Sequence, residues 1–242
     1  MNASLLLLTD SRLPAGGHAH SGGVERAVAS GAVHDAPSLA AFLRGRLHTA
    51  GAVTAALSAA ARSHAAAPGA RRWAELDAEV DARTAAPAQR DASRTQGRLL
   101  LRVARRVWPA PVLEELARAV PSAHHPIALG VAAFAAGASA EEAALAAAYH
   151  AITGPATAAV RLLGLDPVAV HALLAGLTPD MTAVASRACH SPAWEAADSA
   201  ADPDPWLDDP AAGWESLPAP SAPALDLIAE QHAQAEVRLF VS

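Results

Sequence analysis

Apolar and polar positions alternate with helical spacing in the second half of the chain. Ser139 followed by Glu142 forms a capping box, which is a start signal for a helix, and predicts a helix over residues 139–152. Gly154 and Pro155 come next, and this pair predicts that the helix ends there and that another runs to residue 163.

Two further helices are predicted where a capping residue precedes proline. Asp166 before Pro167 opens a helix whose apolar stripe consists of Val170, Leu173, Leu174 and Leu177. The Thr-Pro pair at residues 178–179 is the same kind of start signal and predicts a helix to about residue 190. Short connections between these helices predict a compact, bundle-like layer.

The first half of the chain has a weaker pattern. Residues 1–8 predict a short buried helix, residues 13–17 a turn, residues 24–29 a helix, and residues 39–66 one long helix or two. No strand pattern and no internal repeat is visible. Residues 91–107 predict a helix with one basic face. Like charges at this spacing repel, so the face requires acidic neighbours in the fold or on a partner. It comprises Arg94, Arg98, Arg102, Arg105 and Arg106.

Residues 192–224 differ in kind from the rest. They are rich in proline and acidic residues, and such a stretch buries too little apolar surface to offset its ordering entropy. We predict a flexible linker in which tryptophans 194, 206 and 214 act as anchors. A last helix over residues 224–237 follows, and a terminal segment held by a linker is suited to binding a partner.

Composition supports an all-α fold. The chain holds 242 residues, of which 67 are alanine, and alanine and leucine are the best helix formers. We predict one bundle-like helical domain of about ten helices over residues 1–191, the linker over 192–224, and a C-terminal partner-binding segment over 225–242. The net charge of −6 divides into +5 for residues 1–120 and −11 for residues 121–242.

The composition also excludes several function classes. No lysine is present, which excludes Schiff-base chemistry, a pyridoxal phosphate anchor and the standard P-loop. A single cysteine, Cys189, excludes an internal disulfide and a cysteine-rich zinc site, and we predict that it is a small buried hydrophobe. The negative net charge argues against broad nucleic-acid affinity. No targeting segment and no membrane span is visible, so we expect a cytoplasmic protein.

Histidines are the residues most open to a chemical interpretation. His18 and His20 flank Ala19 beside a glycine-rich turn. They could be a pair of metal ligands or simply turn or surface histidines. We favour the second interpretation, because no cysteine or carboxylate pair completes a ligand set. His124 and His125 before a proline are read as a helix entry in preference to a metal site. Glu25 could act as a general base, but no nucleophile stands at a spacing from it that is diagnostic of catalysis.

Two other patterns receive a structural interpretation. Asp77, Glu79 and Asp81 alternate on a predicted helix and are expected to form a solvated face. A glycine cluster could cradle a phosphate, but with no lysine and no preceding strand, close helix packing is favoured. The cluster consists of Gly16, Gly17, Gly22 and Gly23.

Five segments, in order, resemble the urease accessory protein UreF family. The first, residues 10–25 (DSRLPAGGHAHSGGVE), is similar to the N-terminal signature of that family. The others are similar to its central motif, two further motifs and its ending. They cover residues 90–101, 125–130, 152–164 and 238–242.

The resemblance implies an all-α, usually dimeric scaffold that is not itself an enzyme. Family members act with UreD (also called UreH) and the GTPase UreG to deliver nickel to apo-urease in a GTP-dependent way, without a cofactor or a defined permanent metal site in this subunit. Two alternatives remain open. One is a nickel-binding metallochaperone that uses His18 and His20, and the other is a small helical enzyme with an unrecognised site.

The resemblance also implies where partners bind. It places contacts at the signature turn, on the basic helix and at the C-terminal segment, where Leu239 and Phe240 would be apolar anchors. Position 18 is commonly aromatic in the family and is His18 here. The implied residues are Pro14, Gly16, Gly17, His18, His20, Ser21, Glu25, Arg94, Arg98, Arg238, Leu239 and Phe240.

Overall fold

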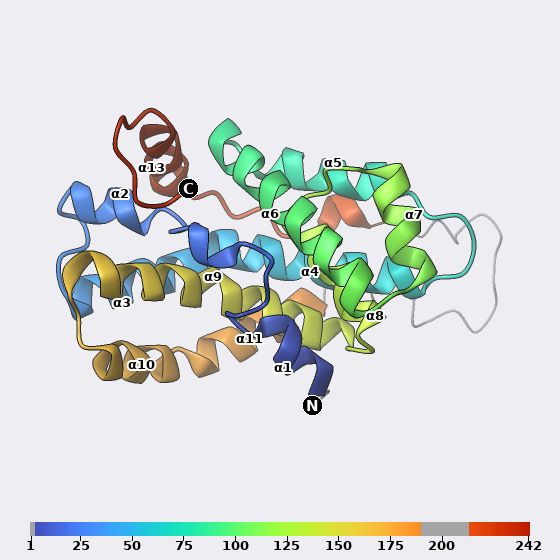
Figure 1. Cartoon of the computed structure of the whole chain (residues 1–242), viewed down its shortest axis with the longest axis horizontal. Helices are drawn as coiled ribbons and strands as arrows, with labels where there is room; N and C mark the ends of the chain where they lie inside the picture. Colours follow the sequence, from blue (N-terminus) through green and yellow to red (C-terminus); the bar gives the residue numbers. More distant parts are fainter. Residues whose placement is uncertain (1–2, 190–212) are drawn as a thin grey trace.

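A computed structural model describes residues 3–189 and 213–242 of the chain. Helices pack around a central helix, and the described residues contain no strand, so the predicted all-α class is confirmed (Figure 1). The two ends of the chain lie on different parts of the surface, and the C-terminal segment returns to the region of the first hundred residues.

From α1 to α11 the elements follow one another with short connections. The first half contains α1 (Ala3–Thr9), the 3-10 turn η1 (Gly17–Ala19), α2 (Val24–Ala29), α3 (Ala36–Arg46), the π-helical turn η2 (Leu47–Gly51), α4 (Ala52–Ala66), α5 (Trp73–Arg83) and α6 (Pro87–Val107). The second half contains α7 (Pro111–Ala119), α8 (His125–Ala135), α9 (Ala140–Leu163), α10 (Pro167–Gly176), α11 (Thr178–Cys189), η3 (Trp214–Ser216) and α13 (Pro223–Ala233).

The core lies between α4, α8 and α9. α4 packs against both of the other helices, α11 closes the far side of α9, and α6 covers α8. The contacting faces are built largely from alanine, which lets the helix axes approach closely. Gly130 of α8 lies against the backbone of α4, because a Cβ atom there would meet the Ser58 carbonyl oxygen and lie 2.7 Å from Ala61 Cβ.

Most predicted helix starts are confirmed. Ser139 and Glu142 form the expected capping box, and the side chain of Asp166 accepts from the backbone of residues 168 and 169. α2 has the predicted bounds. α6 begins at Pro87, four residues before the predicted start, and α13 ends at Ala233, four residues before the predicted end.

The predicted break at residues 154–155 is wrong. α9 runs without interruption from Ala140 to Leu163 and holds Pro155 in its interior. Proline lacks an N–H, so it leaves the carbonyl of Ala151 without its helical donor. The Nε atom of Arg46 donates to that oxygen at 2.9 Å, which replaces the lost hydrogen bond and allows the helix to continue.

The long segment over residues 39–66 follows one helical path. α3 leads into η2 and then α4, so the π-helical turn replaces the break that a two-helix arrangement would need. A π-helical turn inserts an extra residue and shifts the buried face of the following helix. This shift explains why the apolar pattern is compatible with one long helix or with two.

Residues 190–212 lie outside the described residues, and so do two of the three predicted anchors, tryptophans 194 and 206. The third, Trp214, is buried and meets His64 edge to face, with 5.1 Å between ring centroids. Its carbonyl oxygen accepts from Arg83 Nη2 at 2.8 Å. The predicted division into domain, linker and terminal segment stays a prediction.

The described helices differ in length and in apolar character. No single one of them is both long enough and apolar enough to cross a bilayer. The bent pair α10 and α11 passes the same test of length and composition when its two members are taken together.

Candidate partner-binding site

The C-terminal segment docks on the signature turn through backbone hydrogen bonds. Val241 N–H donates to the carbonyl of Ala19 at 2.7 Å, and Ser21 N–H donates to the carbonyl of Ser242 at 2.5 Å. We call residues 238–242 the tail. The turn that receives it is shaped by Gly16, Gly22 and Gly23, whose φ angles of 78°, 59° and 90° favour glycine.

Glu25 holds the tail from the first turn of α2. Its Oε1 accepts the N–H of Leu239 at 2.7 Å and its Oε2 accepts the N–H of Phe240 at 3.1 Å. His232 of α13 supports the same contact, because its Nε2 lies 3.2 Å from the Phe240 carbonyl and must donate to it. Both carboxylate oxygens are therefore occupied by backbone donors, which favours a structural role over that of a general base.

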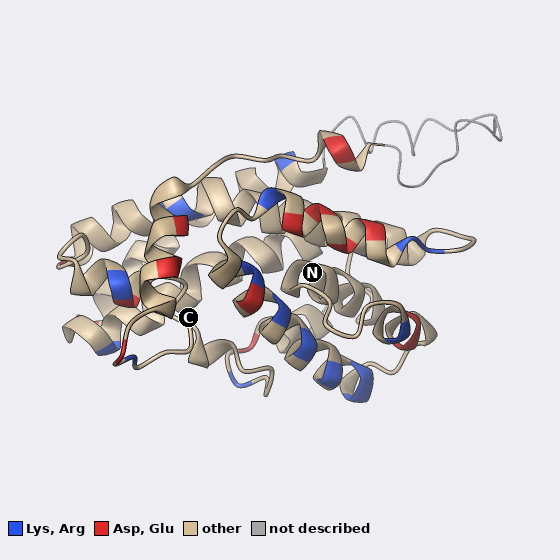
Figure 2. Ribbon diagram, turned by 90° about the horizontal axis from the view of Figure 1, so that it is seen from above, with Lys and Arg blue, Asp and Glu red and all other residues tan. Residues whose placement is uncertain are grey.

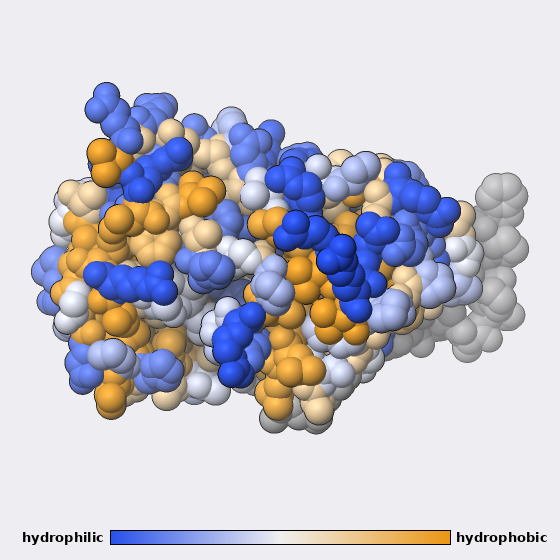
Figure 3. All heavy atoms as spheres, in the orientation of Figure 1, coloured by the Kyte–Doolittle hydropathy of each residue, from blue (hydrophilic) through white to orange (hydrophobic). Residues whose placement is uncertain are grey.

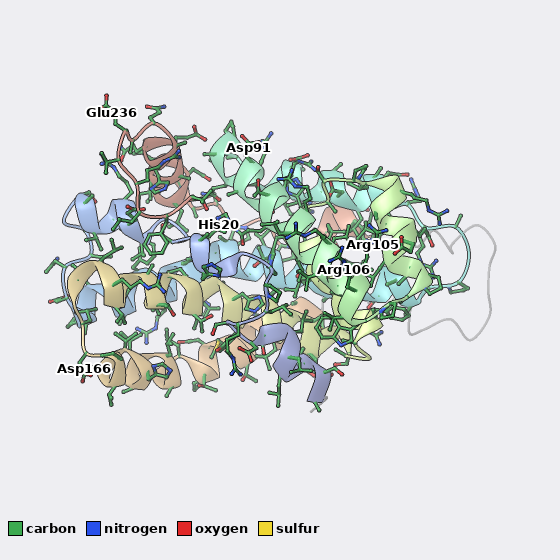
Figure 4. All side chains as sticks on the ribbon, viewed as in Figure 1. His20, Asp91, Arg105, Arg106, Asp166 and Glu236 are labelled. Atoms are coloured by element: carbon green, nitrogen blue, oxygen red, sulfur yellow. The ribbon has the colours of Figure 1, made fainter. Side chains whose placement is uncertain are left out.

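His20 lies inside the joint between turn and tail, whereas His18 is exposed. The Nδ1 atom of His20 lies 2.6 Å from Ser242 Oγ (Figure 4). Burial, with a smaller contribution from His18, lowers the pKa of His20 to about 4, so its ring is neutral at pH 7. Of the two candidate metal ligands, His20 is thus enclosed by the turn and the tail, and His18 is open to solvent.

Among residues 3–189 and 213–242, no three histidine, cysteine or carboxylate side chains are arranged to hold a metal ion. His124 and His125 form the entry to α8, as expected from the sequence. His124 is buried and bonds to Ser93 Oγ through Nδ1 at 3.0 Å and to Asp81 through Nε2 at 2.9 Å.

The tail divides into a buried and an exposed part. Phe240 is 8% exposed and packs against its own chain, while Leu239 is 77% exposed. Val237 and Val241 are also exposed, and so is Leu227 on α13. Glu236 projects outward from the loop between helix and tail (Figure 4). Apolar side chains therefore gather on the outer face of the C-terminal segment.

The basic face of α6 meets acidic neighbours at each end only. Arg94 bonds to Asp77 at 2.9 Å and to Asp81 at 2.6 Å, and Arg105 pairs with Glu114. The expectation that Asp77 and Asp81 belong to a solvated face is therefore wrong for Asp77, which is buried, and incomplete for Asp81. Burial raises the pKa of Asp81, but the stronger combined effect of His124 and Arg94 lowers it.

Four arginines of α6 are exposed, and three of them are not paired with a carboxylate of the described residues. Arg98, Arg102 and Arg106 lie at intervals of four residues, and within the part of the chain that the structure describes they have no carboxylate within 4 Å. Figure 2 shows the arginines of α6 as blue segments along one helix, and Figure 3 shows a strongly hydrophilic band there beside hydrophobic atoms. We call these three residues the arginine stripe.

The structure brings some of the implied partner residues together and separates others. His20, Ser21 and Glu25 meet the tail, while Gly16 lies against α6, where an added Cβ would come within 2.8 Å of Leu99. Pro14 is exposed in the loop before η1, and Gly17 begins η1. Arg94 is tied into the fold. Arg98 and Arg238 remain exposed.

Sequence reasoning missed Arg46 and His232. Arg46 acts on a carbonyl 105 positions away, so no local motif marks it. His232 acts on Phe240, eight positions away, across a loop without regular spacing. A proline inside a strongly helical pattern was the available signal for Arg46, because a continuing helix would require an outside donor. His232 carried no such signal.

Comparison with known proteins gives consistent matches. A sequence model of the UreF family matches residues 33–178. The chain is 45% identical over 242 residues to the urease accessory protein UreF of Mycolicibacterium vanbaalenii, which covers 99% of this chain and 98% of the relative. It is 42% identical over 240 residues to the urease accessory protein UreF of Mycobacterium tuberculosis H37Rv, with the same coverage of each.

Proposed function

Because this chain belongs to the urease accessory protein UreF family, we propose that it is a non-catalytic scaffold for urease maturation. In this role it recruits the GTPase UreG together with UreD, and regulates UreG during GTP-dependent insertion of nickel into apo-urease. The observation that carries the proposal is identity of 42–45% over nearly the whole of both chains.

The C-terminal segment supports a protein-binding role. Leu239 and Val237 expose apolar surface to solvent, as do Val241 of the tail and Leu227 of α13. Exposed apolar side chains on a segment fixed by backbone hydrogen bonds are suited to a partner surface. In this conformation Leu239 and Arg238 are available to a partner, while Phe240 supports them from beneath.

The arginine stripe supports a second contact. Three like charges on one helix face repel each other and are relieved by an acidic surface. We therefore propose that Arg98 and its two neighbours meet an acidic region of a partner protein in the maturation complex. The homodimer, the cytoplasmic location and the boundaries at residues 191 and 224 belong to the same proposal.

The metallochaperone alternative receives less support. A tight nickel site needs several converging nitrogen, sulfur or oxygen ligands. His18 is exposed, and Nδ1 of His20 already faces Ser242 Oγ. Titration of nickel into the chelator-treated protein tests it, because tight stoichiometric uptake would favour a metallochaperone over a scaffold.

The scaffold is tested by co-expression with UreD and UreG homologues, followed by size-exclusion chromatography with light scattering. We expect a co-eluting complex and no GTP hydrolysis by this chain alone. Leu239→Asp places a charge on the exposed tail and is expected to reduce co-elution at least about tenfold, because burying an unpaired charge is costly.

Val168→Asp provides the matched control. Val168 is 75% exposed on α10, far along the chain from the tail, and its substitution is expected to leave the complex intact. A wild-type chain that elutes as a homodimer and binds neither protein would overturn the scaffold proposal. Equal loss of binding in both variants would refute the tail as the contact.

A further inference from the structure

A cavity of about 610 Å³ lies between the helical body and the C-terminal segment. One wall is formed by the junction of α3 and α4 together with α9, and another by the first turns of α6. α13 and the tail line the remaining side. The established family membership assigns no ligand to this space.

Arg46 contributes a partly buried positive charge to the cavity. Its Nε donates to the Ala151 carbonyl at 2.9 Å, and among the described residues neither Nη atom has a hydrogen-bond partner or a carboxylate. Burial lowers the pKa of Arg46 to about 10, so the guanidinium still carries its charge at neutral pH. A charge that is partly removed from water is stabilised by a counter-charge beside it.

The position of this guanidinium is fixed by its surroundings. The bond to Ala151 exists because Pro155 supplies no N–H to that carbonyl. Gly22 leaves room for the group, since a Cβ there would lie 3.2 Å from both Cζ and Nη2 of Arg46. The Nε side of the guanidinium group is thus bound to the protein, and the two Nη atoms remain as hydrogen-bond donors.

A second guanidinium, that of Arg238, also lines the cavity and has no carboxylate partner among the residues described. Two acids line the cavity as well. Asp226 accepts from Gln89 Nε2 at 3.2 Å, and Asp91 is exposed at the start of α6 (Figure 4). Arg46 and Arg238 are therefore lining cations without a carboxylate within 4 Å among the described residues, whereas a third arginine of the lining, Arg83, pairs with Glu79.

We propose that this cavity binds a small oxyanion, such as a phosphate or a carboxylate, on the Nη atoms of Arg46, with Arg238 as a second cation. Guanidinium groups bind such anions through two parallel N–H···O bonds. Hydrogen bonds to charged groups are among the strongest in proteins, and two arginines around one anion add specificity of geometry. The inference does not depend on the scaffold role.

Calorimetric titration of inorganic phosphate into the full chain tests the proposal, with sodium chloride at matched ionic strength as the blank. We expect saturable binding at one site in the wild type. Arg46→Gln should weaken it about tenfold or more, and Arg238→Gln by a smaller factor. Arg161→Gln removes an exposed arginine of α9 outside the cavity and should leave the affinity unchanged.

Arg46→Gln also removes the donor to Ala151, so far-UV circular dichroism must first confirm that its helices are intact. If this variant does not fold, the phosphate affinity of Arg238→Gln tests the proposal in its place. Absence of saturable phosphate binding to the wild type overturns the proposal. An unchanged phosphate affinity in the two cavity variants would also overturn it. An affinity lowered equally by Arg161→Gln would do the same, because either result indicates nonspecific attraction.

Discussion

Gly130 shows how one residue sets the distance between two helices. It lies in α8, where most residues gain helical stability from a side chain, yet its missing Cβ allows contact with the backbone of α4. Gly97 does the same for α6 and the entry of α8, with the backbone nitrogen of His125 only 2.8 Å from its ideal Cβ position. Close helix contact, not flexibility, explains these two glycines.

Gly130→Ala should destabilise the fold even though alanine is the better helix former. The added methyl must displace α4, and overpacking of this kind costs about 1–3 kcal/mol or more, against a propensity gain of about 1 kcal/mol. Gly45→Ala in α3 is the matched control, since its Cβ would meet nothing within 4 Å and should stabilise by up to about 1 kcal/mol. Urea unfolding measures both, and equal effects would contradict this account.

At the scale of elements, Arg46 and Pro155 form a pair that keeps α9 continuous. The helix crosses the core at full length because a side chain from the end of α3 replaces the missing backbone donor. The sequence contains both residues, but they stand 109 positions apart, and the pair becomes visible only when the two helices are side by side.

A double-mutant cycle tests this pair. Arg46→Gln alone should cost about 1–3 kcal/mol, because it leaves a buried carbonyl without a donor. In the Pro155→Ala background the cost should be smaller by about 1 kcal/mol or more, since the alanine N–H can take over the Ala151 oxygen. The free energies of unfolding of the four proteins give the coupling, and additive effects would disprove it.

Local signals predicted helix starts well and helix continuity poorly. The capping box at Ser139 and the N-cap at Asp166 act within one turn, so their physics is contained in neighbouring residues. Asp77 was misjudged because its burial depends on Arg94 and the backbone of His124, which come from other helices. The tail contacts at Glu25 could be anticipated only from the family resemblance, and then as partner contacts.

For the molecule as a whole, histidines with a lowered pKa make the stability depend on pH. Burial is the largest cause that lowers the pKa of each of four rings spread over the fold. The values are about 4 for His20, His64 and His150 and about 3 for His125. In the unfolded chain these groups take up protons near pH 6.5. Between pH 6.5 and about 4 the unfolded state therefore binds more protons.

The free energy of unfolding should accordingly fall as the pH drops from 7 to 5, by about 2–4 kcal/mol after allowance for partial solvent access. Urea unfolding at a series of pH values measures the slope. His150→Gln should reduce the loss, while His171→Gln, an exposed histidine on α10, should not. A stability that is flat across this range would contradict the neutral state of the rings.

The joint between tail and turn has a consequence for the folding pathway. It connects residues 214 to 222 positions apart, whereas the contact of Ser58 with Pro126 in the core spans 68. Closing a longer loop costs more entropy, and contacts of high sequence separation form slowly. The helices around α4 can therefore assemble first, and the tail docks on a core that already exists. Its release is then a local opening with its own small free energy, separate from global unfolding.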